Sequence, residues 1–463
     1  MGFYMKKNVF HDKVFWKALL RLALPIALQN LLTTSLSLID TLMVGRLGDT
    51  AIAAVGIGSQ ISFFCNIVMF GIASGGAVFV AQYWGNGDKD GISRAYVMML
   101  LCNIPIALLF IAAAFTMPKT LIGLFTNDAE VIAVGASYIR IACISYLGVA
   151  LSQTCSIVLR SVEEVKLPFI TSALSVAINT VLNYALIFGK FGCPQLGVDG
   201  AAYATSIAAL IAPVLLLIMS RAKKNAIASN FRAGFRISKD FAKSFFKKSL
   251  PVLANESLWA LGVMCYNAVF GHMGTDNYAA LTIFRTVENI SFVFFVGVCN
   301  ACNVIVAKSI GAGDIDKAKT YAGRFMVIVP VMAVIIGAGV IALRGPILTL
   351  FNSDAYVKTT AAALLMIYGI EMGVRNIPYI SIVGIFRAGG DTKTGMKFDL
   401  MCLWLFALPV TAILGLVFKI DFLIVYTVML LCEDIPKNIM CIQRFRSMKW
   451  IQPVVAVENM EES

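Results

Sequence analysis

The chain of 463 residues is 59% hydrophobic and only 14% charged, and its mean hydropathy is +0.82. Soluble domains carry roughly 25% charged residues, so this composition excludes a soluble protein and indicates a chain that lies in a lipid bilayer. The formal net charge of +12 does not predict nucleic-acid binding, because the basic residues are spread between apolar stretches and form no continuous face.

Twelve apolar stretches, bounded by glycines, prolines and charged residues, are expected to cross a hydrocarbon core of about 30 Å. The first six lie near residues 16–44, 51–84, 93–115, 129–159, 167–189 and 199–220. The second six lie near residues 248–271, 278–309, 320–343, 354–386, 397–418 and 421–443. The number of spans is even, so both termini are predicted on the same side of the membrane.

The distribution of Lys and Arg predicts which side that is, because basic residues gather in cytoplasmic loops. If the termini are cytoplasmic, the inner segments hold 29 of the 38 basic residues and the outer segments hold six. The remaining three, Arg140, Arg285 and Arg375, lie within spans. We therefore expect a multi-pass membrane protein with both termini in the cytoplasm.

The sequence repeats when it is shifted by 226 positions, with no gap over more than a hundred residues. The matches include Pro25 with Pro251, Gly45 with Gly271, Gly48 with Gly274, Ala81 with Ala307, Asp88 with Asp314 and Asp128 with Asp354. With one extra residue, Arg160 falls on Arg387. Each repeat holds six spans, so the halves have the same topology and are related by an axis along the membrane normal.

The repeat predicts an N-terminal six-helix lobe at 1–220, a basic cytoplasmic linker at 221–247 and a C-terminal six-helix lobe at 248–463. The expected fold is an all-α membrane protein of about twelve transmembrane helices, in two pseudo-symmetric lobes around a central cleft. Two lobes that rock about a shared cleft can open it to one side of the membrane at a time. This architecture predicts alternating access.

A charged residue inside a span is a functional signal, because a charge near the bilayer centre costs at least about 2.5 to 3.5 kcal/mol. Asp40 lies in the first span, five residues before Gly45, or roughly 7 Å of helix rise from the outer end. The alternative is a carboxylate that only reaches interfacial water. We favour a functional role.

Glu256 lies in the seventh span, eight residues after Lys248, or roughly 12 Å from the inner end. The repeat aligns Glu256 with Asn30 and Asp40 with Tyr266, so the two halves carry their acids at different places. A buried carboxylate can be neutralised either by a proton or sodium ion or by a cationic substrate, but not by both at once. This mutual exclusion is the minimal requirement for an antiporter.

Four more charged residues lie within spans and leave two alternatives open. Arg285 and Glu288 are three residues apart on the eighth span, and Glu371 and Arg375 are four apart on the tenth. Pairing within each helix and lining of a cavity are equal alternatives for them. Arg140 is a candidate partner for Asp40.

Polar residues on the fifth and sixth spans complete the candidates. Asn179 and Asn183 stand one helical turn apart, and Thr205 follows on the next span. Taken alone, such residues are typical of hydrogen bonds between membrane helices, worth about 0.6 to 2 kcal/mol each. The glycine-rich segment 71–76 is a candidate packing surface for the same reason.

The sequence contains no P-loop, HExxH motif, nucleophile elbow or Ser/His/Asp signature. We expect no enzyme activity, no catalytic residue and no cofactor. The sequence contains only two His residues, which are too few for a histidine-based metal site. Cys299 and Cys302, the one CxxC pair, are interpreted as residues of the packed core.

In several segments the chain resembles the multidrug and toxic compound extrusion (MATE) family of bacterial transporters, over essentially its whole length. The first of these segments runs from Leu24-Pro25 to Gly48 and includes Ile39. The others are Ala81 to Gly85, Leu196 to Ala202, Pro251 to Glu256, and Gly384 to Thr392. The resemblance implies export of cationic amphipathic compounds across the bacterial inner membrane, in exchange for protons or sodium ions.

The resemblance also implies roles for particular residues. The first-lobe ion or proton site falls on Asp40, Asn179, Asn183 and Thr205; some members have an Asp at the position of Asn183. A second-lobe sodium site of another branch matches Glu256, but its tenth-span Asp falls on Asn376, which weakens that site unless Glu288 or Glu371 supplies the charge. The substrate cavity is expected to include Arg285, Glu288, Glu371, Arg375 and Asn376.

The nearest alternative is a flippase for a lipid-linked saccharide or related amphiphile, since related families share the two-lobe architecture. A flippase for an anionic headgroup should line its cavity with Arg and Lys. The charged residues named above within the predicted spans instead include one more acid than base. The expected partners are small cationic amphipathic substrates and membrane lipids. No nucleic acid is expected, a monomer suffices for function, and no metal beyond Na⁺ is expected.

Overall fold

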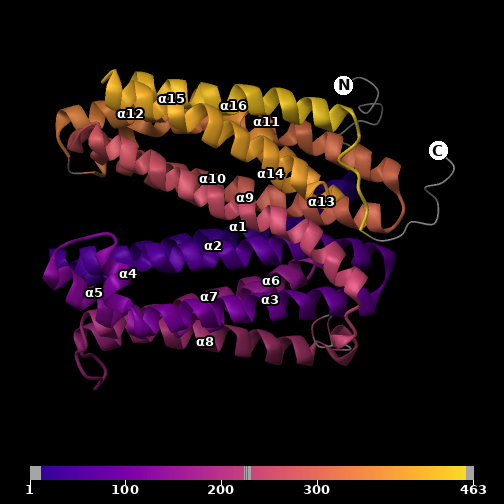
Figure 1. Ribbon diagram of the computed structural model, residues 1–463, viewed down its shortest axis with the longest axis horizontal. Helices are drawn as coiled ribbons and strands as arrows, with labels where there is room; N and C mark the ends of the chain where they lie inside the picture. The colour runs from indigo at the N-terminus through magenta and orange to yellow at the C-terminus, as the bar shows by residue number, and fades with distance from the viewer. Residues whose placement is uncertain (1–11, 224, 226, 228–230, 352, 455–463) are drawn as a thin grey trace. The chain divides into compact units, whose positions relative to one another are not determined.

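A computed structural model describes residues 12–223, 225, 227, 231–351 and 353–454, and these form helices (Figure 1). Nine of the described helical stretches are long and apolar enough to cross a membrane, or ten when the pair α5 (Ala129–Ala142) and α6 (Ser145–Ser161), bent by 48°, counts as one span. The helices α9 (Lys239–His272) and α16 (Phe422–Arg446), which carry polar residues along their length, complete the twelve predicted spans. The predicted all-α fold is confirmed.

Most predicted spans coincide with helices to within a few residues. The remaining elements of the first half are α1 (Lys13–Gly45), α2 (Asp49–Asn86), α3 (Lys89–Thr116), the short α4 (Pro118–Gly123), α7 (Lys166–Phe188), α8 (Val198–Ala222) and the 3₁₀ turn η2 (Phe231–Phe235). α9 begins nine residues before the predicted span at 248, because its first turns are charged and continue the helix outside the apolar stretch.

In the second half, two predicted spans contain π-helical turns. The elements are α10 (Thr275–Gly311), α11 (Ile315–Thr349), α12 (Ala355–Tyr379), η3 (Ile380–Phe386), α13 (Arg387–Gly389), α14 (Thr392–Met401), η4 (Cys402–Ala407), α15 (Leu408–Ala412) and η5 (Ile413–Val417). The tenth span thus runs through α12 and η3, and the eleventh runs from α14 to η5. Such π turns inside helices are frequent at functional sites.

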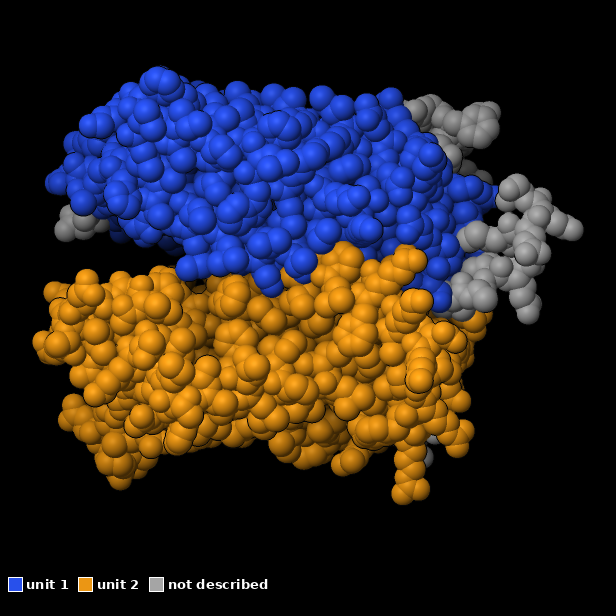
Figure 2. Space-filling view, viewed as in Figure 1, with its two compact units in different colours: residues 1–27, 254–463 blue, residues 28–253 orange. Residues whose placement is uncertain are grey.

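The contacts divide the chain into two compact units, coloured separately in Figure 2. Unit 2 comprises residues 28–253, and unit 1 comprises residues 1–27 and 254–463. The first part of α1 therefore belongs to the unit of the second repeat, and the first part of α9 belongs to the unit of the first repeat. The two divisions, after Ala27 and after Leu253, fall at equivalent positions of the repeat.

Compared with the predicted lobes, unit 2 lacks the start of α1 and includes both the predicted linker and the start of α9, and the lobe limits of 1–220 and 248–463 stay a prediction. The linker predicted for 221–247 includes residues 224, 226 and 228–230, which lie outside the described residues. Its described part contains η2 and the beginning of α9. The two termini also lie outside the described residues.

The repeat extends to the details of helix ends. The side chain of Asp88 caps α3 by accepting from the backbone N–H of Gly91 at 2.7 Å, and the equivalent Asp314 caps α11 by accepting from Lys317 at 3.0 Å. Each cap follows a glycine with positive φ, Gly87 at 74° and Gly313 at 77°. Asp and Asn side chains satisfy the free N–H groups of a first helical turn, so the repeated residues produce the same turn twice.

Close helix packing within unit 2 depends on the glycine-rich segment 71–76 of α2. A Cβ added at Gly71 would lie 2.6 Å from the Cα of Leu253, and one added at Gly75 would lie 2.5 Å from the Cα of Ser249. α2 and the first part of α9 therefore contact each other through backbone, as small residues allow in membrane helices. The prediction of a packing surface here is confirmed.

Candidate functional site

Asp40 on α1 and three polar residues of α7 and α8 form one hydrogen-bonded group in unit 2, which we call the Asp40 cluster: Asp40, Asn179, Asn183 and Thr205. Asn183 donates its side-chain amide to Asp40 Oδ1 at 2.6 Å and to Asn179 Oδ1 at 2.8 Å. Asn179 in turn donates to Thr205 Oγ1 at 3.5 Å. The structure thus brings together four residues that the sequence predicted for one site.

The positions of these residues follow from local helix geometry. Asn179 and Asn183 are four residues apart on α7, so they lie on the same face of that helix. α8 approaches α7 at Gly200, where an added Cβ would lie 2.6 Å from the carbonyl oxygen of Leu186. This close approach places Thr205, five residues further along α8, next to Asn179.

Among the described residues, the hydrogen-bond partner of the Asp40 carboxylate is the neutral side chain of Asn183. The predicted candidate cation, Arg140, instead lies over the ring of Phe115, with its guanidinium carbon 5.6 Å from the ring centroid. Asn179 and Asn183 are 3% and 1% exposed, so their amides are shielded from solvent. A carboxylate that accepts a hydrogen bond from one amide, and has no cationic partner in the described part of the chain, can bind a proton or a cation without first breaking an ion pair.

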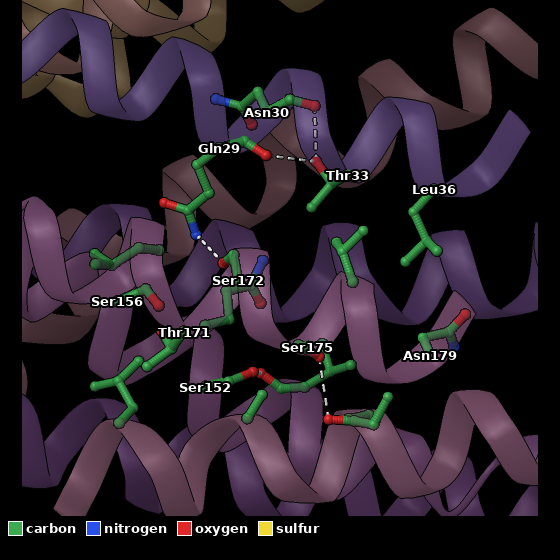
Figure 3. A pocket seen from close by; sticks show the side chains of 18 of the residues that line it. Gln29, Asn30, Thr33, Leu36, Ser152, Ser156, Thr171, Ser172, Ser175 and Asn179 are labelled. Atoms are coloured by element: carbon green, nitrogen blue, oxygen red, sulfur yellow. Dashed lines mark hydrogen bonds between the residues drawn. The ribbon is translucent and has the colours of Figure 1, made fainter. Parts of the chain in front are cut away.

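A pocket of about 370 Å³ opens beside the Asp40 cluster within unit 2 (Figure 3). It is enclosed by α1, α6, α7 and α8, with one residue of α2. Its polar lining residues are Gln29, Asn30, Thr33, Ser152, Gln153, Ser156, Arg160, Thr171, Ser172, Ser175, Asn179 and Thr205. We call this the unit 2 pocket, and its volume falls in the range of small-molecule sites.

Hydrogen bonds hold several of these side chains in place (Figure 3). Gln29 donates to Ser172 Oγ at 2.6 Å and accepts from Arg160 Nη2 at 2.6 Å. Ser175 donates to the carbonyl of Ala208 at 3.2 Å. The residues Asn179 and Thr205 belong both to the pocket lining and to the Asp40 cluster, so the pocket and the acid are connected.

The other predicted acid, Glu256 on α9, lies in unit 1 and is not part of this cluster. It forms an ion pair with Arg387 of α13, and the two side chains are 13% and 3% exposed. Glu256 therefore differs from Asp40 in that its charge is neutralised by a buried guanidinium. Sequence analysis had identified both residues without predicting that they pair.

The charged residues of the tenth span pair between helices and not within them. Arg375 of α12 forms its ion pair with Glu288 of α10 at 3.0 Å, so of the two alternatives left open for these residues, the pairing of Arg375 with Glu371 within one helix is not the one observed. Glu371 lies against Asp434 of α16, and in the described part of the chain neither of its buried carboxylate oxygens has a hydrogen-bond partner. Asn376 is 2% exposed and donates to the carbonyl of Met372.

A group of charged residues that the sequence analysis missed surrounds Lys437 in unit 1. Lys437 lies 2.8 Å from both Asp399 of α14 and Glu433, and Tyr266 of α9 donates to Glu433 at 3.1 Å. The available signal was three ionisable residues, Glu433, Asp434 and Lys437, inside one predicted span. Among the described residues, no group of three or more His, Cys, Asp or Glu side chains is arranged to hold a metal ion.

Comparison with known proteins gives two matches to one family. The MatE family model matches residues 25–185 and again residues 251–413, and the two matches begin 226 positions apart. The probable multidrug resistance protein NorM of Thermotoga maritima is 24% identical over 411 residues, which are 88% of this chain and 87% of that protein. The multidrug resistance protein PmpM of Pseudomonas aeruginosa is 25% identical over 410 residues, 86% and 84% of the two chains.

Solved structures match the fold over nearly the full length. A MATE crystallised in complex with MaL6 superposes with a TM-score of 0.85 at 17% identity, over 94% of this chain and 97% of that one. This likeness confirms the twelve-helix, two-lobe fold that was predicted from the internal repeat.

Proposed function

Since the chain belongs to the MatE family of multidrug and toxic compound extrusion transporters, we propose that it exports cationic amphipathic compounds in exchange for protons or sodium ions. The family makes the chain a multi-pass membrane transporter. The names of the relatives NorM and PmpM support multidrug efflux as the kind of transport. The coupling ion, the exchange mechanism and the substrates are the parts that we propose.

The observation that carries the proposal is the environment of Asp40. Its carboxylate lies on a membrane helix, accepts a hydrogen bond from Asn183 and has no cationic side chain as a partner among the residues that the structure describes. Burial of such a charge is costly until a proton, a sodium ion or a cationic substrate neutralises it. Competition between the ion and the cationic substrate for this one carboxylate would couple the inward movement of the ion to the outward movement of the substrate.

The proposed coupling site is the Asp40 cluster. Asn179, Asn183 and Thr205 would position the carboxylate and contribute oxygen ligands to a bound cation. Glu256 would join the coupling only when its ion pair with Arg387 opens, because the paired carboxylate is already neutralised. Arg285, Glu288, Glu371, Arg375 and Asn376 remain proposed residues of a substrate cavity.

The two matches to the family model support alternating access, because each corresponds to one half of a duplicated transporter. We place the protein in the bacterial inner membrane with cytoplasmic termini, on the distribution of basic residues. It would act without cofactor or catalytic residue, as a transporter and not as an enzyme. Membrane lipids and small cationic amphipathic molecules would be its partners, and a single chain would suffice.

The test is ethidium movement in proteoliposomes under an imposed proton or sodium gradient. We expect one gradient to drive ethidium against its concentration, and we expect Asp40→Asn to abolish this movement while the protein still inserts and purifies normally. The gradient that works identifies the coupling ion. Absence of ethidium movement under both gradients would contradict the proposal for this probe.

One observation favours the alternative of a flippase for a lipid-linked saccharide. The lining of the unit 2 pocket is rich in hydroxyl and amide groups, and its charged lining residue is a cation, Arg160. Sugar hydroxyls and anionic headgroups are recognised by such groups. Transfer of a fluorescent glycolipid between leaflets, measured by quenching from the outer face, would support this alternative if ethidium is not transported.

A further inference from the structure

The first turns of α1 and α9 carry the same set of three basic residues, spaced four residues apart. We call these sets the first stripe, on α1, and the second stripe, on α9; they consist of Lys13, Lys17 and Arg21, and of Lys239, Lys243 and Lys247. The shift of 226 positions lays one stripe on the other, residue by residue. The spacing places the three cations of each stripe on one side of its helix.

The opposite side of each helix start is packed into its own unit. In unit 1, Phe15 is fully buried, and its ring centroid lies 5.4 Å from that of Phe325 of α11. In unit 2, Phe245 is fully buried, and its ring centroid lies 5.6 Å from that of Phe79 of α2. This packing fixes the rotation of both helix starts, so each stripe points away from the core of its unit.

All six cations are exposed, and large apolar side chains are exposed beside them. Leu20 and Leu24 are 59% and 55% exposed next to the first stripe, and Phe246 and Leu250 are 37% and 49% exposed next to the second. None of the six cations is part of an ion pair among the residues that the structure describes. Basic and apolar side chains on one helix surface are typical of the boundary between lipid headgroups and acyl chains.

The lengths of α1 and α9 place the stripes at that boundary. The helices have 33 and 34 residues, or about 50 Å each, whereas the hydrocarbon core is about 30 Å thick. Roughly 20 residues, counted back from the predicted outer ends at Gly45 and His272, are enough to cross the core. Both stripes then lie on its cytoplasmic side, where charged groups remain solvated.

The repeat preserves the stripes although it does not preserve the coupling acids. Over the twelve positions that begin at Lys13 and at Lys239, four residues are identical, namely two lysines of the stripe, the inward Phe15 and the exposed Leu24. Asp40 and Glu256, by contrast, have no acidic counterpart in the other half. A feature retained in both halves serves something that the halves share, and both halves share the membrane.

We infer that the two stripes bind the phosphate groups of anionic phospholipids in the cytoplasmic leaflet. Lys and Arg side chains form charge-assisted hydrogen bonds to phosphate oxygens, and basic clusters beside membrane helices attract anionic lipids. The exposed leucines and Phe246 would contact the adjoining acyl chains. The occupant is therefore a lipid such as phosphatidylglycerol, which carries a net negative charge, and not the zwitterionic phosphatidylcholine. The choice of leaflet rests on the proposed cytoplasmic termini.

Phosphatidylglycerol and phosphatidylcholine with identical acyl chains provide a matched pair of probes. Native mass spectrometry of the purified full-length protein in detergent counts the lipids of each kind that remain bound. At low ionic strength we expect the unmutated protein to bind phosphatidylglycerol at least about tenfold more tightly than phosphatidylcholine. The preference should decrease as salt is added, because the cations are exposed and salt screens them.

Two triple variants remove one stripe each: Lys13→Gln with Lys17→Gln and Arg21→Gln, and Lys239→Gln with Lys243→Gln and Lys247→Gln. Each should lose about half of the tightly bound phosphatidylglycerol, since the other stripe remains, and the combination of all six should lose the preference. Unchanged binding of phosphatidylcholine would show that the variants are folded. Replacement of the three lysines of the second stripe by arginine should keep the preference, because the charge stays.

A third triple variant is the matched control: Lys119→Gln with Lys190→Gln and Lys419→Gln. These lysines are also exposed, but they lie near the predicted outer ends of their helices. The control changes the net charge of the protein as much as the loss of one stripe does. It should keep the full preference for phosphatidylglycerol.

The inference is overturned if the unmutated protein binds the two lipids equally. It is also overturned if the variant without both stripes keeps the preference, or if the control loses as much of it as the stripe variants do. Failure of the export proposal gives a different result, because the lipid preference would remain while no gradient moves ethidium in proteoliposomes.

Discussion

Asn183 donates its side-chain amide to the carboxylate of Asp40 at 2.6 Å, and the same nitrogen lies 2.8 Å from the amide oxygen of Asn179. α1 and α7 are therefore joined at the predicted coupling acid by a residue that cannot itself be charged. Relatives with an Asp at this position would have two acids here, whereas this chain has one. Coupling through the Asp40 cluster would then depend on one carboxylate and on the amide that orients it.

Replacing Asn183 by Leu should reduce gradient-driven ethidium export at least about tenfold, because Asp40 loses its hydrogen-bond donor and its orientation toward Asn179. Hydrogen bonds between membrane helices contribute about 0.6 kcal/mol on average, so the protein should still insert and purify. The initial rate of export in proteoliposomes, normalised to the amount of protein inserted, is the measurement.

Thr205→Val is the matched control for Asn183→Leu. The Thr205 hydroxyl accepts a long hydrogen bond of 3.5 Å from Asn179, and no hydrogen bond joins it to Asp40 among the described residues. The valine variant should lose less activity than the leucine variant. Equal losses in the two variants would contradict a larger role of Asn183 than of Thr205 in the Asp40 cluster.

Gly75→Ala should destabilise the protein by about 1 to 3 kcal/mol, because the new methyl group would lie 2.5 Å from the backbone of Ser249 and the helices would have to separate. Gly56→Ala, in the same helix, meets no atom within 4 Å and should be neutral or slightly stabilising. The temperature at which half of the detergent-solubilised protein remains monodisperse is the measurement. Similar midpoints for the two variants would contradict the close α2–α9 packing.

The helices and the Asp40 cluster could be predicted because their signals are local. Apolar stretches have the length of a bilayer span, and a lone Asp in the first stretch is conspicuous against them. The i, i+4 spacing of Asn179 and Asn183 places both on one helix face. The prediction that they contact Asp40, however, depended on the family resemblance, since the spacing of residues on one helix does not show which other helix lies against that face.

The partners of the other charged residues could not be predicted, because they depend on tertiary packing. Lys437 lies within the last predicted span and is buried between Asp399 of α14 and Glu433 of α16, which come from different helices. Arg375 similarly pairs with Glu288 of another helix and not with Glu371, its neighbour in sequence. Spacing identifies pairs along one helix, whereas membrane charges also find partners across helices.

The ion pair between Asp12 and Arg324 should make the start of α1 sensitive to acid. Asp12 lies before α1, 2.6 Å from Arg324 of α11, and its carboxylate also accepts from the backbone N–H of Phe15. The hydrogen bond from Arg324, followed by that from Phe15, lowers the pKa of Asp12 below its ordinary value of 3.8. The stabilisation is therefore complete above pH 3.8 and is lost as the pH falls through the lowered pKa.

Comparison of the unmutated protein with Asp12→Asn measures this effect. The difference in melting temperature between the two should be constant near neutral pH and should shrink once the pH falls below about 4. The effect should be small, since the Asp12 side chain is 28% exposed and exposed ion pairs contribute little. A difference that grows on acidification would have the wrong sign for a carboxylate stabilised in its charged form.

The ion pair between Glu256 and Arg387 should be structural in its closed form. The two side chains are 13% and 3% exposed, so removal of either partner takes from the other its oppositely charged partner in a buried ion pair. Glu256→Gln and Arg387→Gln should therefore each destabilise the protein by about 3 to 5 kcal/mol, as measured by its unfolding in detergent. The double variant removes both charges at once and should recover much of this loss.

Transport by the double variant then separates a structural role from a coupling role. If Glu256 serves only to neutralise Arg387, the double variant should regain ethidium export along with stability, because no unpaired charge remains. If Glu256 also exchanges ions, stability should return while export coupled to the gradient stays low. Because Asp40 has no such cationic partner among the described residues, a rescue by a second substitution is not expected for Asp40→Asn, which should lose coupling without a comparable loss of stability.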